Sequence, residues 1–168
     1  MSIFLDKKIL IYGLGKSGLS TYHFLKNKSD ISLFDDFKNK FKNLDIKKKI
    51  VSYKKILKIK FDQIILSPGI DINNCKLSKF LKKNRKRIYS DLDIFYSFYK
   101  NDTITITGTN GKSTTCQLLY EVLLNQKFDV KLVGNIGNPI LSSKSIKKKP
   151  FLLLKLRLIN LNIVRFLG

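Results

Sequence analysis

Residues 103–114 read TITITGTNGKST, and this stretch decides the fold. Residues 103–107 are β-branched throughout, which predicts a strand. Residues 112–126 predict a helix, so the glycine-containing loop between them joins a strand directly to a helix. This is the setting in which a Gly-Lys-Ser sequence binds phosphate. The predicted phosphate loop comprises Gly108, Thr109, Asn110, Gly111, Lys112, Ser113 and Thr114.

The chemistry of such a loop follows from its backbone. N–H groups at the start of a helix point toward an anion, and the helix dipole favours negative charge there. Lys112 is expected to bridge the outer phosphates of a nucleotide, and the Ser113 hydroxyl is expected to bind Mg²⁺. The loop has two residues, instead of four, between its first glycine and Gly-Lys. The alternative is therefore an ordinary strand-to-helix turn that happens to contain these residues.

A second glycine-rich turn lies near the N-terminus, where residues 13–18 read GLGKSG. An apolar strand is predicted at residues 8–13 and a helix at 17–26, and Asp35 and Asp36 stand at the end of a predicted strand at 31–35. A G-x-G-x-x-G turn followed by an acid about twenty residues on is typical of a site for a nucleotide pyrophosphate. NAD binding, or a turn whose glycines serve only packing, remain open at this point.

The order of elements predicts the fold class. Further strands are predicted at 62–66 and 129–133, and a helix begins at Asp91. Strands that alternate with helices form parallel sheets covered on both faces. We therefore expect an α/β protein with a Rossmann-like domain over residues 1–100. The start of a second, phosphate-loop domain is expected over residues 101–168.

Composition narrows the function classes. The chain has 168 residues, is 43% hydrophobic, and has two cysteines and one histidine. A folded cytoplasmic protein without a disulfide framework or zinc site is expected. The sequence has no run of about twenty apolar residues, so no membrane span is expected. The net charge of +21 comes mostly from scattered lysines, which we interpret as solvated surface. Nucleic acid is not expected as a partner, and a nucleic-acid binder remains the alternative that rests on charge alone.

Several motifs together carry a family resemblance. Besides TGTNGKST at 107–114, the chain has SPGI at 67–70, SDLDIF at 90–95 and GNIGNP at 134–139. Over roughly residues 7–150 this set resembles the Mur ligases, and among them the enzymes that add D-glutamate to UDP-N-acetylmuramoyl-L-alanine. The resemblance implies a reaction that uses ATP and Mg²⁺ and passes through an acyl phosphate. It also implies a P-loop ATPase-like central domain and a monomer. Another Mur ligase, a folylpolyglutamate synthase relative, or a non-catalytic nucleotide-binding remnant are the alternatives.

The resemblance assigns roles to individual residues. The UDP-muramoyl substrate is expected at Gly15, Lys16, Ser17, Asp35, Ser67, Pro68, Gly69 and Asn135, with Asp35 at the uracil. ATP is expected at residues 108–114, where Lys112 would stabilise the transferring phosphoryl group and Ser113 would hold the metal.

The last residues depart from the family pattern. After a strand at 151–154 the resemblance predicts Glu-x-Ser-Ser, whereas the chain reads KLRLINLNIVRFLG from residue 155. A shift of reading frame would restore that motif, so residues 153–168 are expected to be out of frame. The polypeptide is therefore expected to be an inactive fragment, with residues 151–154 still forming a buried strand.

Overall fold

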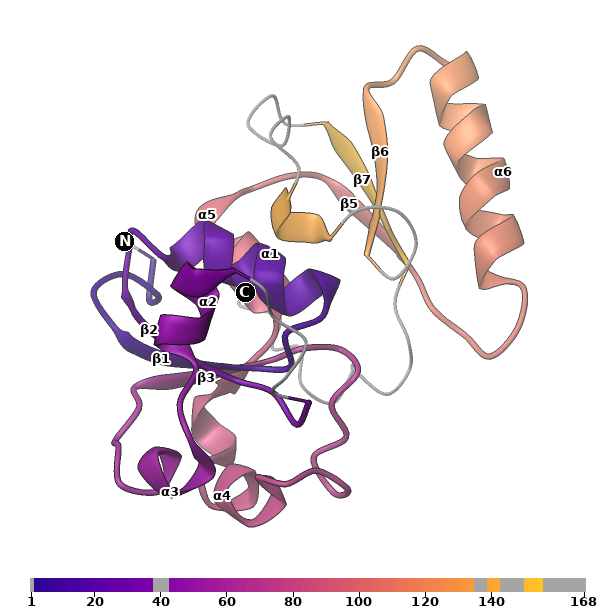
Figure 1. Ribbon diagram of the computed structural model, residues 1–168. Helices are drawn as coiled ribbons and strands as arrows, with labels where there is room; N and C mark the ends of the chain where they lie inside the picture. Colours follow the sequence, from indigo (N-terminus) through magenta and orange to yellow (C-terminus); the bar gives the residue numbers. More distant parts are fainter. Residues whose placement is uncertain (1, 38–42, 135–138, 143–149, 156–168) are drawn as a thin grey trace.

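The computed structural model describes residues 2–37, 43–134, 139–142 and 150–155, and it contains two parallel sheets (Figure 1). The first has the strand order β2-β1-β3-β4, and the second has the order β5-β7-β6. The first sheet consists of β1 (Lys8–Tyr12), β2 (Asp30–Phe34), β3 (Gln63–Leu66) and β4 (Ile88–Tyr89), with helices α1 (Lys16–Leu25), α2 (Leu44–Lys49), α3 (Tyr53–Ile56), α4 (Ser78–Lys83), η2 (Arg85–Arg87) and α5 (Asp91–Phe98). The second comprises β5 (Thr103–Ile106), α6 (Lys112–Asn125), β6 (Val130–Gly134), η3 (Ile140–Ser142) and β7 (Phe151–Lys155).

The first sheet is buried on both faces because alternate residues of each strand point to opposite sides. Ile9 and Ile11 of β1 belong to one apolar cluster, with α1 and α5. Leu10 and Tyr12 belong to another, together with Ile56 of α3 and Leu81 of α4 (this and the first cluster are the two halves of the core). Figure 1 shows α1 and α5 on one side of these strands and α3 and α4 on the other. The predicted covering of both faces is confirmed for this sheet.

The N-terminus of α5 is fixed by a reciprocal cap. The Ser90 hydroxyl accepts a hydrogen bond from the Asp93 N–H, and Asp93 Oδ2 accepts from the Ser90 N–H at 2.6 Å. Both groups are buried, so each satisfies a helix-end donor that water cannot reach. This cap explains why the helix begins at Asp91, as the sequence predicts.

The second sheet has β7 between β5 and β6. Leu153 of β7 pairs with Ile104 on one side and Leu132 on the other, and Leu152, Leu153 and Leu154 are buried. The predicted buried strand at 151–154 is confirmed. The expected change of frame falls largely on residues 156–168, which lie outside the described residues.

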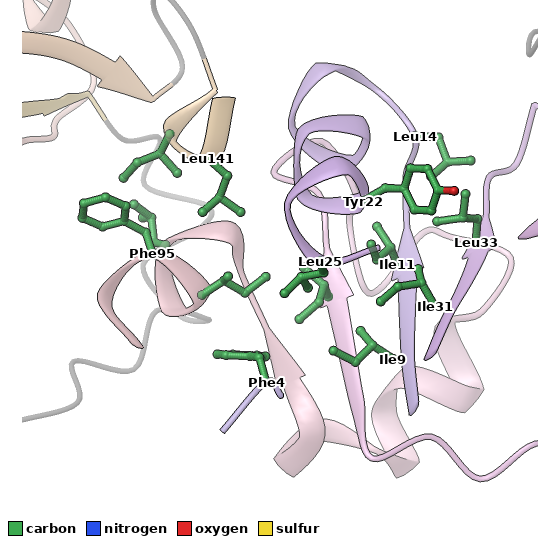
Figure 2. Close-up of a cluster of buried hydrophobic side chains, with 14 of the residues drawn as sticks. Phe4, Ile9, Ile11, Leu14, Tyr22, Leu25, Ile31, Leu33, Phe95 and Leu141 are labelled. Atoms are coloured by element: carbon green, nitrogen blue, oxygen red, sulfur yellow. The ribbon is translucent and has the colours of Figure 1, made fainter. Parts of the chain in front are cut away.

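The two sheets share one apolar cluster. Ile140 and Leu141 of η3 belong to the same buried cluster as Leu25 of α1 and Phe95 of α5. Figure 2 shows Leu141 and Phe95 on one side of this cluster and Leu25 on the other. The second sheet begins at Thr103, close to the division predicted at residue 101. That division stays a prediction, since the packing of η3 links the two sheets.

Candidate functional site

The carboxyl ends of β1, β2 and β3 bring the N-terminal motifs together. These strands are parallel neighbours, so the residues after each meet at one edge of the sheet. Asp35, after β2, accepts a hydrogen bond from the Leu14 N–H at 2.6 Å. Ser67, after β3, donates its hydroxyl proton to the Gly13 carbonyl at 2.5 Å. The structure therefore places Asp35 and Ser67 against the glycine-rich turn, as the sequence predicts. It also gives both a bracing role that the sequence did not indicate.

The structure explains two of the three glycines of this turn, each on a different ground. Gly13 has φ +91°, a conformation that L side chains rarely adopt. A Cβ on Gly18 would lie 1.9 Å from the Gly13 carbonyl oxygen, so the start of α1 approaches the turn too closely for any side chain. A Cβ on Gly15 would meet nothing within 4 Å, and its φ is −72°. The fold explains Gly13 and Gly18, whereas Gly15 leaves open space at the helix start.

That open space lies where an anion would bind. Gly15 caps α1 without a side-chain hydrogen bond, and no acid lies in the first turn. Lys16 is exposed there, and Ser17 follows it. N–H groups of a first helical turn carry partial positive charge, which a phosphate oxygen complements. Gly15, Lys16 and Ser17 could therefore hold a pyrophosphate. Pro68 and Gly69 follow Ser67 at the same edge of the sheet.

Asp91 is a second acid at this site, and the sequence did not identify it as functional. Its carboxylate accepts a hydrogen bond from the Ser17 hydroxyl at the start of α1. Burial raises the pKa of Asp91 to about 6, and the nearby charge of Asp93 acts in the same direction. Hydrogen bonds from the Leu92 backbone and from Ser17 partly counteract that rise. The SDLDIF motif indicated a functional role for this segment. It could not indicate the contact with Ser17, because that contact joins elements far apart in sequence.

The raised pKa of Asp91 predicts a pH dependence of stability. The native state binds the Asp91 proton more tightly than the unfolded state, so the free energy of unfolding falls as pH rises from about 4 to about 6. A two-unit difference in pKa corresponds to at most about 3 kcal/mol. Asp91→Asn should remove this component and leave the variant more stable than the wild type at pH 7. Urea unfolding at several pH values measures the difference. Asp45→Asn, at an exposed acid in α2, is the control, and parallel wild-type and Asp91→Asn profiles would contradict the assignment.

A neighbouring polar cluster was also missed from the sequence. The Tyr12 hydroxyl donates to both oxygens of Asp36, at 3.0 and 2.9 Å. Burial, followed by the hydrogen bond with Asp36, raises the pKa of Tyr12. Lys76 Nζ donates to the Asp36 carbonyl at 2.9 Å, which ties the segment before α4 to the end of β2. Asp36 therefore anchors the edge of the site.

The loop before α6 has the backbone that a phosphate site requires. Gly108 has φ +139° and Gly111 has φ +74°, and neither would bring a Cβ closer than 3.9 Å to a neighbour. Gly111 caps α6 without a side-chain bond. Lys112 Nζ donates to the carbonyls of Gly108 and Thr109, the latter at 2.7 Å. The lysine thus curls over the loop and leaves the helix N-terminus accessible.

The surroundings of this loop are described only in part. Ser113 and Thr114 are exposed at the start of α6, beside Asn110 of the loop. In the described ranges no group of three or more His, Cys, Asp or Glu side chains could hold a metal. Lys155 ends β7 in register with Ile106 of β5, the strand that leads into the loop. Asn135 lies outside the described residues.

One further property concerns membranes. Among the helices that the structure describes, none is both long and apolar enough to cross a bilayer.

Comparisons with known proteins show which family this chain is similar to. Residues 7–88 match the family model described as Mur ligase MurD-like, N-terminal domain. The chain is similar to UDP-N-acetylmuramoylalanine--D-glutamate ligase of Rickettsia bellii, with 37% identity over 151 residues, 88% of this chain and 33% of that protein. The protein of the same name from Rickettsia prowazekii is 38% identical over 86% of this chain and 33% of its own length. That from Clostridioides difficile is 36% identical over 82% and 32%. The chain spans about a third of the length of these curated relatives.

The fold and the glycine-rich turn define a Rossmann-like α/β unit followed by a second strand-loop-helix unit. The family match covers the first unit, and the alignments with the relatives extend into the second. Residues 7–88 belong to the MurD-like N-terminal domain family of the Mur ligases, and the similarity to these ligases extends over most of the chain.

Proposed function

We propose that this chain is part of an ATP-dependent ligase that adds D-glutamate to UDP-N-acetylmuramoyl-L-alanine in the synthesis of peptidoglycan precursors. The proposal rests on relatives that carry this activity in their names and align across both units of the chain. One structural observation supports it. The space beside Gly15 is open, and the packing of the fold does not require a glycine at this position. An ATP-consuming reaction of this kind fits a cytoplasmic location.

The first unit would hold the UDP part of the substrate. The N–H groups after Gly15, that of Ser17 among them, and the exposed ammonium of Lys16 would bind the pyrophosphate, while the Ser17 hydroxyl stays with Asp91. Asp35 would accept a hydrogen bond from the uracil, because each carboxylate oxygen can accept more than one hydrogen bond. Its Oδ2 already accepts from Leu14 and its Oδ1 from Phe37, which fix its orientation. Ser67, Pro68 and Gly69 would line the substrate site at the same edge of the sheet.

The second unit would hold ATP. Glycine at positions 108 and 111 permits the positive φ angles and leaves the loop backbone open to phosphate oxygens, so these residues fit the group. Bound Mg²⁺-ATP supplies the phosphoryl group that activates the muramoyl-alanine carboxylate as an acyl phosphate for attack by the D-glutamate amine. Lys112 would leave its loop carbonyls and place its positive charge against the transferring phosphoryl oxygens. Ser113 would supply a hydroxyl oxygen to the metal.

Gly15→Ala tests the substrate site. The added methyl would occupy the space proposed for the pyrophosphate, so we expect binding of UDP-N-acetylmuramoyl-L-alanine to weaken about tenfold or more, roughly 1.4 kcal/mol. Folding should be nearly unchanged, because the methyl meets nothing within 4 Å and φ is −72°. Titration calorimetry measures the affinity.

The matched control is Lys26→Ala, at the other end of α1. It should bind the substrate like the wild type. If Gly15→Ala also bound with wild-type affinity while folded, the pyrophosphate would not lie at this helix, and the proposed substrate site would be wrong.

A further inference from the structure

The side of the first sheet that carries α3 and α4 concentrates positive charge that the proposed ligase reaction does not use. Ile56 of α3 and Leu81 of α4 are buried in the same apolar cluster, and Figure 1 shows the two helices next to each other, away from α1 and α5. Their outward side chains are largely cationic and exposed. We call the basic face the set formed by Lys54, Lys55, Lys58, Lys60, Lys79, Lys82, Lys83, Arg85 and Lys86.

Little negative charge offsets this face. Residues 46–61 and 72–90 contain no Asp or Glu. Asp62 accepts a hydrogen bond from the Lys8 N–H at 2.9 Å at the start of β1. Asp71 accepts from the backbone of Asn73 and the side chain of Asn74, which lower its pKa, with a smaller contribution from the charge of Lys82. Within the described ranges the one ion pair joins Lys49 of α2 to Asp30 of β2.

Apolar side chains are exposed among these lysines. Tyr53 is 42% exposed and Leu57 is 52% exposed, and they lie one helical turn apart at α3. Residues four apart lie on the same side of a helix, so these two form a small apolar surface. Lysine stems can cover such a surface while their ammonium groups stay in water. The face therefore combines cations with an aromatic ring and a leucine.

We propose that the basic face docks on an anionic lipid bilayer. Clustered lysines are attracted to an anionic membrane surface, and exposed Leu and Tyr side chains enter the region between headgroups and acyl chains. The composition of the face favours lipid over nucleic acid. Arg85 is its single arginine, whereas phosphate recognition in nucleic acids relies on the planar guanidinium fork. The lysines that look scattered in the sequence gather on one side because α3 and α4 cover the same sheet surface.

Flotation of the full 168-residue chain with vesicles tests this proposal, because aggregated protein sediments while vesicle-bound protein rises. Vesicles of phosphatidylcholine with phosphatidylglycerol are compared with pure phosphatidylcholine. The test variant replaces Lys54, Lys55, Lys82 and Lys83 with Gln. The matched control replaces Lys26, Lys47, Lys48 and Lys100 with Gln, which removes the same charge from exposed positions outside the face. A third variant, Leu57→Ser, tests the apolar contribution.

The wild type and the control should float with the anionic vesicles and be released by raising salt from about 0.05 to 0.5 M. The basic-face variant should bind roughly six-hundredfold more weakly, since each of its four lysines near such a surface contributes about fivefold. Leu57→Ser should bind severalfold more weakly. Equal losses in the basic-face variant and the control would show a non-specific charge effect and overturn the proposal. Failure to float, or tighter binding to single-stranded RNA than to the vesicles at equal salt, would also overturn it.

Discussion

Gly18→Ala is expected to destabilise the chain by about 3 kcal/mol or more, because overpacking a rigid contact typically costs 1–3 kcal/mol and the clash here is with backbone. The new Cβ would lie 1.9 Å from the Gly13 carbonyl oxygen and 2.8 Å from the Ser67 hydroxyl. Relief requires α1 to move away from β1, which would separate Tyr22 and Leu25 from the core. A loss of this size is a large part of the stability of an ordinary domain.

Gly15→Ala is the matched comparison, since it adds the same methyl three residues earlier in the same turn. There the methyl meets nothing within 4 Å. Alanine is a poorer helix cap than glycine, but it also restricts the unfolded chain, and these small effects oppose each other. Urea unfolding followed by circular dichroism should show a much lower midpoint for Gly18→Ala and a nearly unchanged midpoint for Gly15→Ala. Equal midpoints for Gly18→Ala and the wild type would mean that the turn is not packed as described.

Lys112→Ala should weaken ATP binding by about a hundredfold, because hydrogen bonds to charged groups contribute about 1.5–3 kcal/mol each. The ammonium of Lys112 is the cation at the start of α6, and it already lies over the loop through the carbonyls of Gly108 and Thr109. Its loss removes the charge that would face the outer phosphates. Titration with ATP in the presence of Mg²⁺ measures the effect.

Lys112→Arg separates charge from shape, since arginine keeps the charge but replaces a compact ammonium with a wide planar fork. We expect it to bind ATP more weakly than the wild type and more tightly than Lys112→Ala. Lys127→Ala, beyond the far end of α6, should bind ATP normally. Equal ATP affinity of Lys112→Ala and the wild type, or no ATP binding by the wild type, would contradict the proposed role of the loop.

Elements next to the glycine turns could be predicted from sequence because their signals are local. The strand expected at 8–13 is Lys8–Tyr12, and the helix expected at 112–126 is Lys112–Asn125. A short apolar run that ends in glycine, or a Gly-Lys-Ser loop, needs no distant contact to be recognised. The pattern of a G-x-G-x-x-G turn with an acid about twenty residues on also predicted Asp35 near the turn, where it contacts Leu14, and its role at the uracil stays a prediction.

The elements that the sequence did not predict depend on distant contacts. Helices α3 and α4 are short and rich in lysine, and each is held mainly by a few buried residues such as Ile56 and Leu81. Such segments lack the periodicity that marks a helix. The difference between Gly15 and Gly18 likewise depends on the position of the Gly13 carbonyl, which a sequence does not display. Asp91 acquires its contact with Ser17 only when α5 packs beside α1.

The most direct test of the central claim compares two ligands of the glycine-rich turn. Titrating the chain separately with UDP-N-acetylmuramoyl-L-alanine and with NADH asks whether Gly15, Lys16 and Asp35 hold a UDP substrate or a dinucleotide. We predict saturable binding of the UDP compound that is at least about tenfold tighter than any binding of NADH. Preferential binding of NADH would contradict the assignment of the first unit as the UDP-substrate domain of a Mur ligase.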